Sequence, residues 1–106
     1  MGGEPGLRKA ATDADVKVRW TSLSLGDVAR LHAFLAEVNR LSAAKVVRSF
    51  TAAARQLREH PRSGELLEEF APREARRLIV GSCEMRYEIT EQAIFILRLW
   101  HGHEDR

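Results

Sequence analysis

The sequence predicts an α+β domain with the order strand, helix, helix, strand, strand, strand, in which an antiparallel helical hairpin packs on one face of a small, mainly antiparallel sheet. Three observations predict it. Residues 93–100 form a short run of bulky apolar and β-branched residues, as strands do. Two stretches between residues 24 and 60 repeat apolar residues every three to four positions, which is typical of amphipathic helices. Short turns join the last three predicted strands, which favours antiparallel neighbours.

The length and composition indicate one small domain of a cytoplasmic protein. The chain has 106 residues, of which 44% are hydrophobic and 30% charged, so it can bury one core and remain soluble. Its formal net charge is only +2, so any basic binding surface has to be local. The single cysteine, Cys83, allows no internal disulfide, as in a reducing compartment. We find neither a signal peptide nor an apolar run long enough to span a bilayer, and expect no membrane association.

The folded domain is expected to begin at residue 16. Residues 1–15 hold three glycines, a proline and mixed charges without periodicity, which indicates a disordered tail before a domain covering residues 16–106. The first segment of the domain alternates between apolar and basic residues, which predicts a half-buried strand. Its apolar side carries Val16, Val18 and Trp20, and its other side carries Lys17 and Arg19.

The first helix follows this strand. Thr21, Ser22 and Ser24 supply side-chain oxygens for helix-capping hydrogen bonds, and Asp27 places a carboxylate near the positive end of the helix. Apolar residues then recur at helical spacing, which predicts one buried stripe. The stripe consists of Leu25, Val28, Leu31, Leu35 and Val38.

A second helix is predicted from Ala43 to about His60. Ser42 is its expected cap, and Pro61 ends it because the residue before a proline disfavours the helical conformation. Its buried stripe consists of Val46, Phe50, Ala53 and Leu57. Only a brief turn separates the two helices, so we expect an antiparallel hairpin whose stripes pack on the apolar face of the sheet.

Three strands complete the prediction, at residues 76–80, 83–89 and 93–100, after a connector at residues 62–75. In the middle one the core side is expected to carry Cys83, Met85, Tyr87 and Ile89. The last strand is expected to lie at the centre of the sheet, with Arg98 on the face away from the helices. Its helix-facing residues are predicted to be Phe95, Leu97 and Leu99.

Basic residues gather on the predicted open face of the sheet. They are Lys17, Arg19, Arg86 and Arg98, together with Arg76 or Arg77. Two interpretations remain open. The arginines could be solvated strand residues paired with Glu84 and Glu88, in which case each pair stabilises little. They could instead form a concave cationic surface for an acidic peptide or a phosphate chain.

The segment around His101 and His103 could have three roles. As zinc ligands the two histidines lack further partners nearby, so we predict no metal site and no cofactor. An imidazole titrates near neutrality and could act as an acid or a base. A plain C-terminal tail is the simplest role for His103. Trp100, just before this segment, could cap the edge of the core or anchor a partner.

The predicted layout, together with six segments, resembles the RelE/ParE superfamily of toxins from bacterial type II toxin–antitoxin modules, and the resemblance covers about Val16 to Arg106. The segments are VRW at 18–20, DVARL at 27–31, HPRSG at 60–64, RLIV at 77–80, MRY at 85–87 and ILRLWHG at 96–102. The two well-formed helices and the His-Gly ending are most similar to the ParE branch, also called plasmid-stabilisation proteins. Many relatives carry arginine at the position of His103.

The resemblance implies an α+β toxin that is neutralised by a small antitoxin encoded beside it. The expected antitoxin is a ParD-like ribbon-helix-helix protein that forms a two-plus-two assembly with the toxin, and DNA would be contacted only through it. ParE-like members are described as inhibitors of DNA gyrase, whereas RelE-like members cut messenger RNA on the ribosome.

Residue chemistry favours the first of these two activities. Cutting RNA through its own 2′-hydroxyl needs a base, cations for the phosphate, and an acid. Tyr87 falls on the core side of its strand, and only His101 and His103 could supply an imidazole, so the catalytic set is incomplete. We therefore favour gyrase inhibition over ribosome-dependent mRNA cleavage, with an inactive antitoxin-binding relative as a third reading. No catalytic residue is predicted. The candidate residues for binding the target or the antitoxin are Arg77, Arg86, Arg98, Trp100, His101, His103 and Arg106.

Overall fold

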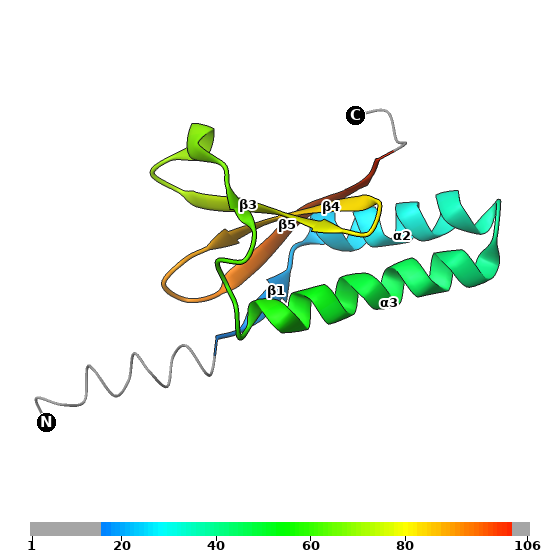
Figure 1. Ribbon diagram of the computed structural model, residues 1–106, viewed down its shortest axis with the longest axis horizontal. Helices are drawn as coiled ribbons and strands as arrows, with labels where there is room; N and C mark the ends of the chain where they lie inside the picture. The colour runs from blue at the N-terminus through cyan, green and yellow to red at the C-terminus, as the bar shows by residue number, and fades with distance from the viewer. Residues whose placement is uncertain (1–15, 103–106) are drawn as a thin grey trace, which may run out of the picture.

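The computed structural model describes residues 16–102, so the predicted tail at residues 1–15 and the candidate residues His103 and Arg106 lie outside the described part of the chain. Within that part, two helices cover one face of a mixed, mostly antiparallel sheet of five strands (Figure 1). The elements are β1 (Val18–Trp20), α2 (Ser22–Ala36), α3 (Arg40–Leu57), β2 (Glu65–Leu66), the 3₁₀ turn η1 (Glu68–Phe70), β3 (Glu74–Val80), β4 (Cys83–Ile89) and β5 (Ile94–His101). The predicted α+β class and order are confirmed, and β2 is an addition within the connector.

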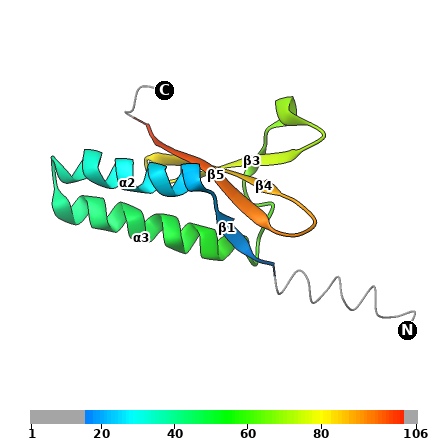
Figure 2. The same ribbon diagram turned by 180° about the vertical axis from the view of Figure 1, so that it is seen from behind.

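The last strand lies inside the sheet, as predicted. The strand order is β1-β5-β4-β3-β2, so β5 separates the first strand from the hairpin of β3 and β4. It runs parallel to β1 and antiparallel to β4, and Figure 2 shows β1 beside its first half. Because β1 pairs with residues 94–96, the second half of β5 has no strand on that side within residues 16–102. Helix α2 packs there instead.

Helix α2 is tied to β5 at its first turn. The Thr21 hydroxyl accepts a hydrogen bond from the Ser24 N–H (3.1 Å) and donates one to the carbonyl of Ile96 (2.7 Å). The predicted apolar stripe is only partly correct: Leu31 is buried, but Leu25 is 55% exposed and Val38 lies beyond the helix. Ser24 and Asp27 take the inward positions because their side chains have partners there, Ser24 at the Thr21 carbonyl and Asp27 on β5.

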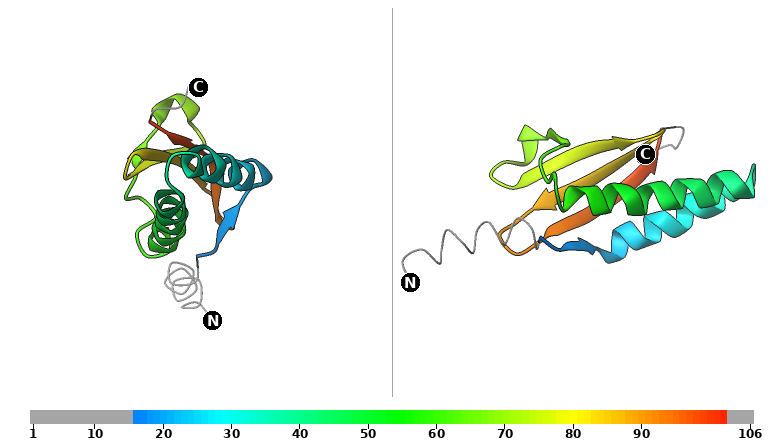
Figure 3. Two further views of the ribbon diagram at one scale, coloured as in Figure 1. Left: turned by 90° about the vertical axis from the view of Figure 1, so that its right-hand side faces the viewer. Right: turned by 60° about the horizontal axis from the view of Figure 1, so that its bottom comes forward.

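Helix α3 begins three residues earlier than predicted. Its cap is Asn39, whose side-chain oxygen accepts from the N–H groups of Leu41 and Ser42, so Ser42 is already helical. The predicted stripe is confirmed, since Val46 packs against the core and Phe50, Ala53 and Leu57 are buried. The two helices lie next to each other on the same side of the sheet, and the tip of their hairpin extends beyond the strands (Figure 3).

A bulge in β5 reverses the facing of its side chains. Arg86 pairs with Arg98 and Tyr87 pairs with Ile96, so Leu97 is the extra residue. Consequently Ile94 and Ile96 face the helices before the bulge, and Leu99 and His101 face them after it. The predicted register is therefore wrong for Phe95 and Leu97, which lie on the open sheet face (the side away from the helices), and correct for Leu99. Strict alternation cannot hold across an inserted residue.

Candidate binding surfaces

Arg98 does not point freely from the open sheet face, because Asp27 of α2 holds it. Its Nε and Nη2 donate to the two carboxylate oxygens of Asp27, at 2.8 and 3.1 Å. The same carboxylate accepts from the backbone N–H of Leu99 (2.9 Å) and from Arg30, whose other nitrogen donates to the Leu99 carbonyl (3.0 Å). Asp27 and Arg30 therefore hydrogen-bond the N–H and C=O groups of Leu99, on the side of β5 where β1 no longer pairs with it.

The buried Asp27 carboxylate is kept ionised by these donors. Burial alone would raise its pKa, but the hydrogen bonds from Arg98, the Leu99 N–H and Arg30 together outweigh that effect and lower the pKa. In return, the hydrogen bond to Asp27 raises the pKa of Arg98. The cluster joins α2 to β5 through one buried carboxylate and two partly exposed arginines.

Two arginines stack on one tryptophan at the end of the open sheet face. The Arg86 guanidinium carbon lies 4.8 Å from the centre of the Trp100 ring, and that of Arg98 lies 5.5 Å from it. Arg86 also approaches the ring of Phe70 at 6.0 Å, and its Nε donates to the buried Glu84 (3.0 Å). We call Phe70, Arg86, Arg98 and Trp100 the arginine–tryptophan stack. With Arg73, Ala75 and Leu97 they line a hollow of about 140 Å³.

Four arginines around the open sheet face are each paired with a carboxylate. The pairs are Arg73–Glu88, Arg77–Glu65, Arg86–Glu84 and Arg98–Asp27. The open face therefore carries local ion pairs, and the interpretation as paired strand residues describes the arginines better than an uncompensated cationic surface does.

The structure brings together only some of the predicted site residues. Arg86, Arg98 and Trp100 are in contact, and Arg77 is the neighbour of Arg86 on β3. His101 is not among them: it faces the helices, where its ring packs against Phe34 with 5.8 Å between centroids. Regular alternation explains this placement, because His101 lies two residues after Leu99 and shares its side, opposite to Arg98 and Trp100.

Tyr87 is a structural residue of the core, as predicted. Its hydroxyl donates to the Pro61 carbonyl (2.7 Å) and accepts from the Gly64 N–H (3.0 Å), and burial raises its pKa. A Cβ at Gly64 would lie 2.7 Å from both this hydroxyl and the Arg77 carbonyl, so only glycine fits. The pair anchors the connector between α3 and β2.

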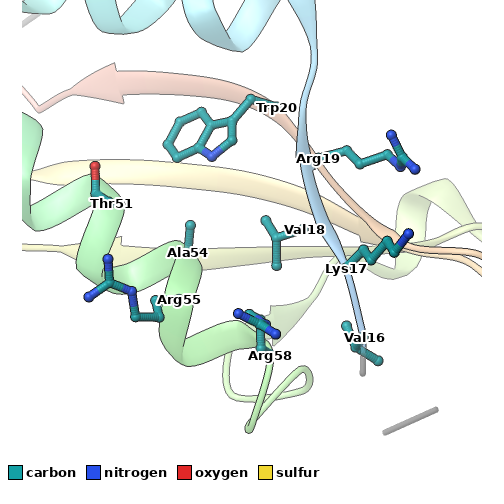
Figure 4. A pocket seen from close by; sticks show the side chains of 9 residues that line it. All are labelled: Val16, Lys17, Val18, Arg19, Trp20, Thr51, Ala54, Arg55 and Arg58. Carbon is teal, nitrogen blue, oxygen red and sulfur yellow. The ribbon is translucent and has the colours of Figure 1, made fainter. Parts of the chain in front are cut away.

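A second basic surface was not predicted from the sequence. A groove of about 560 Å³ separates β1 from the end of α3 (Figure 4). This β1–α3 groove is lined by Val16, Lys17, Val18, Arg19, Trp20, Thr51, Ala54, Arg55 and Arg58. The basic residues of the first strand were recognised, but no sequence pattern places the end of α3 beside them.

Residues 16–102 hold neither a metal-binding cluster nor a membrane-spanning helix. No three His, Cys, Asp or Glu side chains lie close enough together to hold a metal ion. In the same residues no helix combines the length and the apolarity needed to cross a bilayer.

This architecture also occurs in a solved protein structure. The chain matches a solved structure of the chromosomal ParDE TA system from P. aeruginosa with a TM-score of 0.67, covering 83% of this chain and 97% of that chain at 16% identity. This likeness establishes the fold: two helices on a sheet, as in that toxin–antitoxin system. No match was found among curated proteins.

Similarity of the sequence to a family model identifies the family. A family model described as the ParE toxin of the type II toxin–antitoxin system, parDE, matches residues 18–106. The chain belongs to the ParE toxin family, which confirms the resemblance to the ParE branch.

Proposed function

We propose that this protein is a cytoplasmic toxin that arrests growth by inhibiting DNA gyrase, and that a ParD-like ribbon-helix-helix antitoxin encoded beside it neutralises it in a two-plus-two assembly. Membership of the ParE family over residues 18–106 supports the toxin–antitoxin part of this proposal. The choice of gyrase rests on the chemistry of the open sheet face.

The arginine–tryptophan stack is the observation that favours a binding inhibitor. Trp100 presents a flat aromatic surface that two guanidiniums hold in place, and tryptophan and arginine are the residues most enriched at binding hot spots. Both guanidiniums are also engaged with carboxylates, which reduces the net positive charge they offer to a phosphate. Such a surface recognises a partner through shape and stacking rather than through charge alone.

The same residues are poorly arranged for cutting RNA. The Tyr87 hydroxyl is buried between two backbone groups, and His101 lies on the helix side of the sheet, away from Arg86. A nuclease would need an acid and a base on the face that receives the phosphate. This arrangement supports gyrase inhibition over mRNA cleavage.

Exposed apolar side chains on the helical hairpin and its connecting turn support a protein partner. Leu23, Leu25, Val38 and Leu41 are each more than half exposed. Leu25 also borders a hollow of about 230 Å³ between the two helices and the end of β1, which we call the hairpin hollow. It is lined by Trp20, Leu25, Val28, Val47, Phe50 and Thr51. Apolar surface of this kind marks interaction sites on small proteins. We assign it to the antitoxin.

Two parallel assays test the proposal. Purified protein is added to DNA gyrase supercoiling reactions with ATP and to translating ribosomes with mapped messenger ends, each with and without the antitoxin. Inhibited supercoiling with intact messenger, reversed by the antitoxin, is the expected result. Codon-phased messenger cuts with unaffected gyrase would replace gyrase inhibition by ribonuclease activity.

A further inference from the structure

Helix α3 and the residues at its two ends carry basic side chains and no acidic ones. Residues 38–58 contain five of the 17 lysines and arginines of the chain and none of its 15 aspartates and glutamates. Since the whole chain has a formal net charge of only +2, its positive charge is concentrated on this element. We call the five basic residues the α3 ridge: Arg40, Lys45, Arg48, Arg55 and Arg58.

The α3 ridge occupies one side of its helix. At about 100° per residue, its members fall within about 140° of the helix circumference, opposite to the buried Phe50, Ala53 and Leu57. All five are exposed, and none of them has an ion-pair partner within residues 16–102. In the right-hand view of Figure 3, α3 runs along the front of the molecule. The ridge is therefore an exposed row of uncompensated positive charges, about 27 Å long.

This arrangement of charges does not stabilise the helix. Lys45 and Arg48 lie three residues apart, as do Arg55 and Arg58, and like charges at that spacing repel each other. Arg40 is the first residue of α3, where the helix macrodipole disfavours a positive charge. A helix face that is only solvated usually mixes both signs of charge, so that neighbouring side chains attract each other. The uniform sign of the ridge therefore indicates a negatively charged ligand.

The surface between these charges suits a phosphate chain better than a protein. None of the large exposed apolar side chains lies between residues 42 and 58. Small or polar residues separate the charges instead, among them Ser49, Ala52 and Gln56. Protein interfaces are centred on apolar and aromatic side chains, which this face lacks. A phosphate backbone needs spaced cations and room for its oxygens, and the ridge provides both.

A duplex fits the ridge better than a single strand does. Proteins that bind single strands stack the bases on aromatic side chains, and the only aromatic residue among residues 38–58 is the buried Phe50. A duplex instead presents its phosphates on the outside, and the length of the ridge corresponds to about eight base pairs of B-DNA. Lysine and arginine side chains along one straight helix can therefore reach several phosphates of the same duplex.

We propose that the α3 ridge binds the phosphate backbone of duplex DNA independently of its sequence. The biological role of this contact rests on the proposed function, because a toxin that binds DNA gyrase lies beside the duplex on which gyrase acts. The resemblance implies a contact with DNA through the antitoxin, and the ridge adds a contact made by the toxin itself. The ridge thereby favours gyrase that already holds DNA over the free enzyme.

The salt dependence of DNA binding tests the inference. The affinity of purified toxin for a fluorescent duplex of about 20 base pairs is measured by anisotropy, and four phosphate contacts predict a slope of about −4 for log affinity against log salt. Lys45→Gln/Arg48→Gln should reduce the slope by about 2 and the affinity by about 10-fold at low salt. The control, Lys17→Gln/Arg19→Gln, removes the same charge from exposed residues that point away from α3 (Figure 4) and should stay within about threefold of wild type. Equal losses in the two variants overturn the inference, and circular dichroism verifies that both fold.

Further ligands separate the alternatives. Duplexes rich in A·T and in G·C should bind equally, because the ridge contacts phosphates and not base edges. Tighter binding of single-stranded RNA than of the duplex, lost in the ridge variant, overturns the choice of DNA. A ridge variant that loses affinity for the antitoxin but not for DNA makes the ridge a protein interface instead. Failure of wild-type toxin to bind the duplex refutes only this inference, whereas DNA binding without inhibition of gyrase refutes only the proposed function.

Discussion

The open sheet face and the β1–α3 groove are both rich in basic residues, but they use them differently. On the open face, Arg86 and Arg98 are bound to Glu84 and Asp27 and stack on Trp100. In the groove, by contrast, the lining contains no acidic residue. The arginines of the open face are held by carboxylates and stabilise that surface. The basic residues of the groove have no such carboxylate in its lining, so their charge is available to a partner. The number of basic residues therefore does not distinguish the two surfaces, whereas the presence or absence of a paired carboxylate does.

The strongest test of this contrast removes Asp27. Asp27→Ala leaves the buried Leu99 N–H without its acceptor and Arg98 without its carboxylate, so the free energy of unfolding should fall by about 3 kcal/mol. Urea unfolding measures this, with Asp27→Asn as the matched variant that keeps size but loses charge and should fall in between. A loss no larger than for an exposed ion pair would show that the open face is not fixed by its arginines.

Acid should weaken the same contact more gently, because protonation removes the charge but not the side chain. The folded-state pKa of Asp27 is lowered from its ordinary value of 3.8. The stabilisation is therefore complete above that value and is lost as the pH falls through the lowered pKa. The difference in unfolding free energy between wild type and Asp27→Asn should be constant from about pH 5 to 7 and shrink below about pH 4. A difference that persists at low pH would mean that the ionised form is not favoured by folding.

The third test addresses recognition by the open face. Trp100→Ala removes the aromatic surface on which two arginines stack, and should weaken gyrase inhibition by roughly 30-fold, or about 2 kcal/mol. Phe34→Ala is the matched control, since it truncates a partly exposed aromatic residue on the helix side. Equal losses for the two variants would remove the arginine–tryptophan stack from the target surface.

The smallest effect is expected at Arg77. Its partner, Glu65, is an exposed side chain, and the hydrogen bond between them raises the pKa of Arg77 without fixing either residue in the core. Arg77→Ala should leave the urea midpoint unchanged within experimental error. It should also reduce gyrase inhibition less than Trp100→Ala does. A clear loss of stability would show that even the outer arginines of this face are structural.

Local patterns were sufficient for the order of elements and for much of the core. Alternation in residues 83–89 correctly placed Met85 and Tyr87 inward, and helical spacing correctly identified Phe50 and Leu57. These predictions succeeded because each depends on neighbours in one segment. The ParE assignment came from short segments that follow one another in the expected order, and the family match confirms it.

The candidate site was harder to predict because long-range contacts determine it. Asp27 was read as a helix-capping carboxylate, but it lies in the second turn of α2 and binds Arg98 and Leu99, more than 70 residues away. The bulge at Leu97 places Phe95 and Leu99 on opposite sides of the sheet, whereas strict alternation would have placed them on the same side. Nothing in the local sequence of β5 indicates an inserted residue, since every position of it tolerates a strand.

The position of β5 in the sheet has a consequence for synthesis. β1 is made before the other strands of residues 16–102, and within those residues it pairs with β5 alone. It therefore has no sheet to join until residues 94–96 have been translated. Until then the edge of β1 and the end of α3 are not held at a fixed separation, and the β1–α3 groove does not exist. A partner that binds this groove therefore cannot engage incomplete chains there. It acts on each toxin molecule only after β5 has been inserted between β1 and β4, which is also when Arg98 and Trp100 complete the arginine–tryptophan stack.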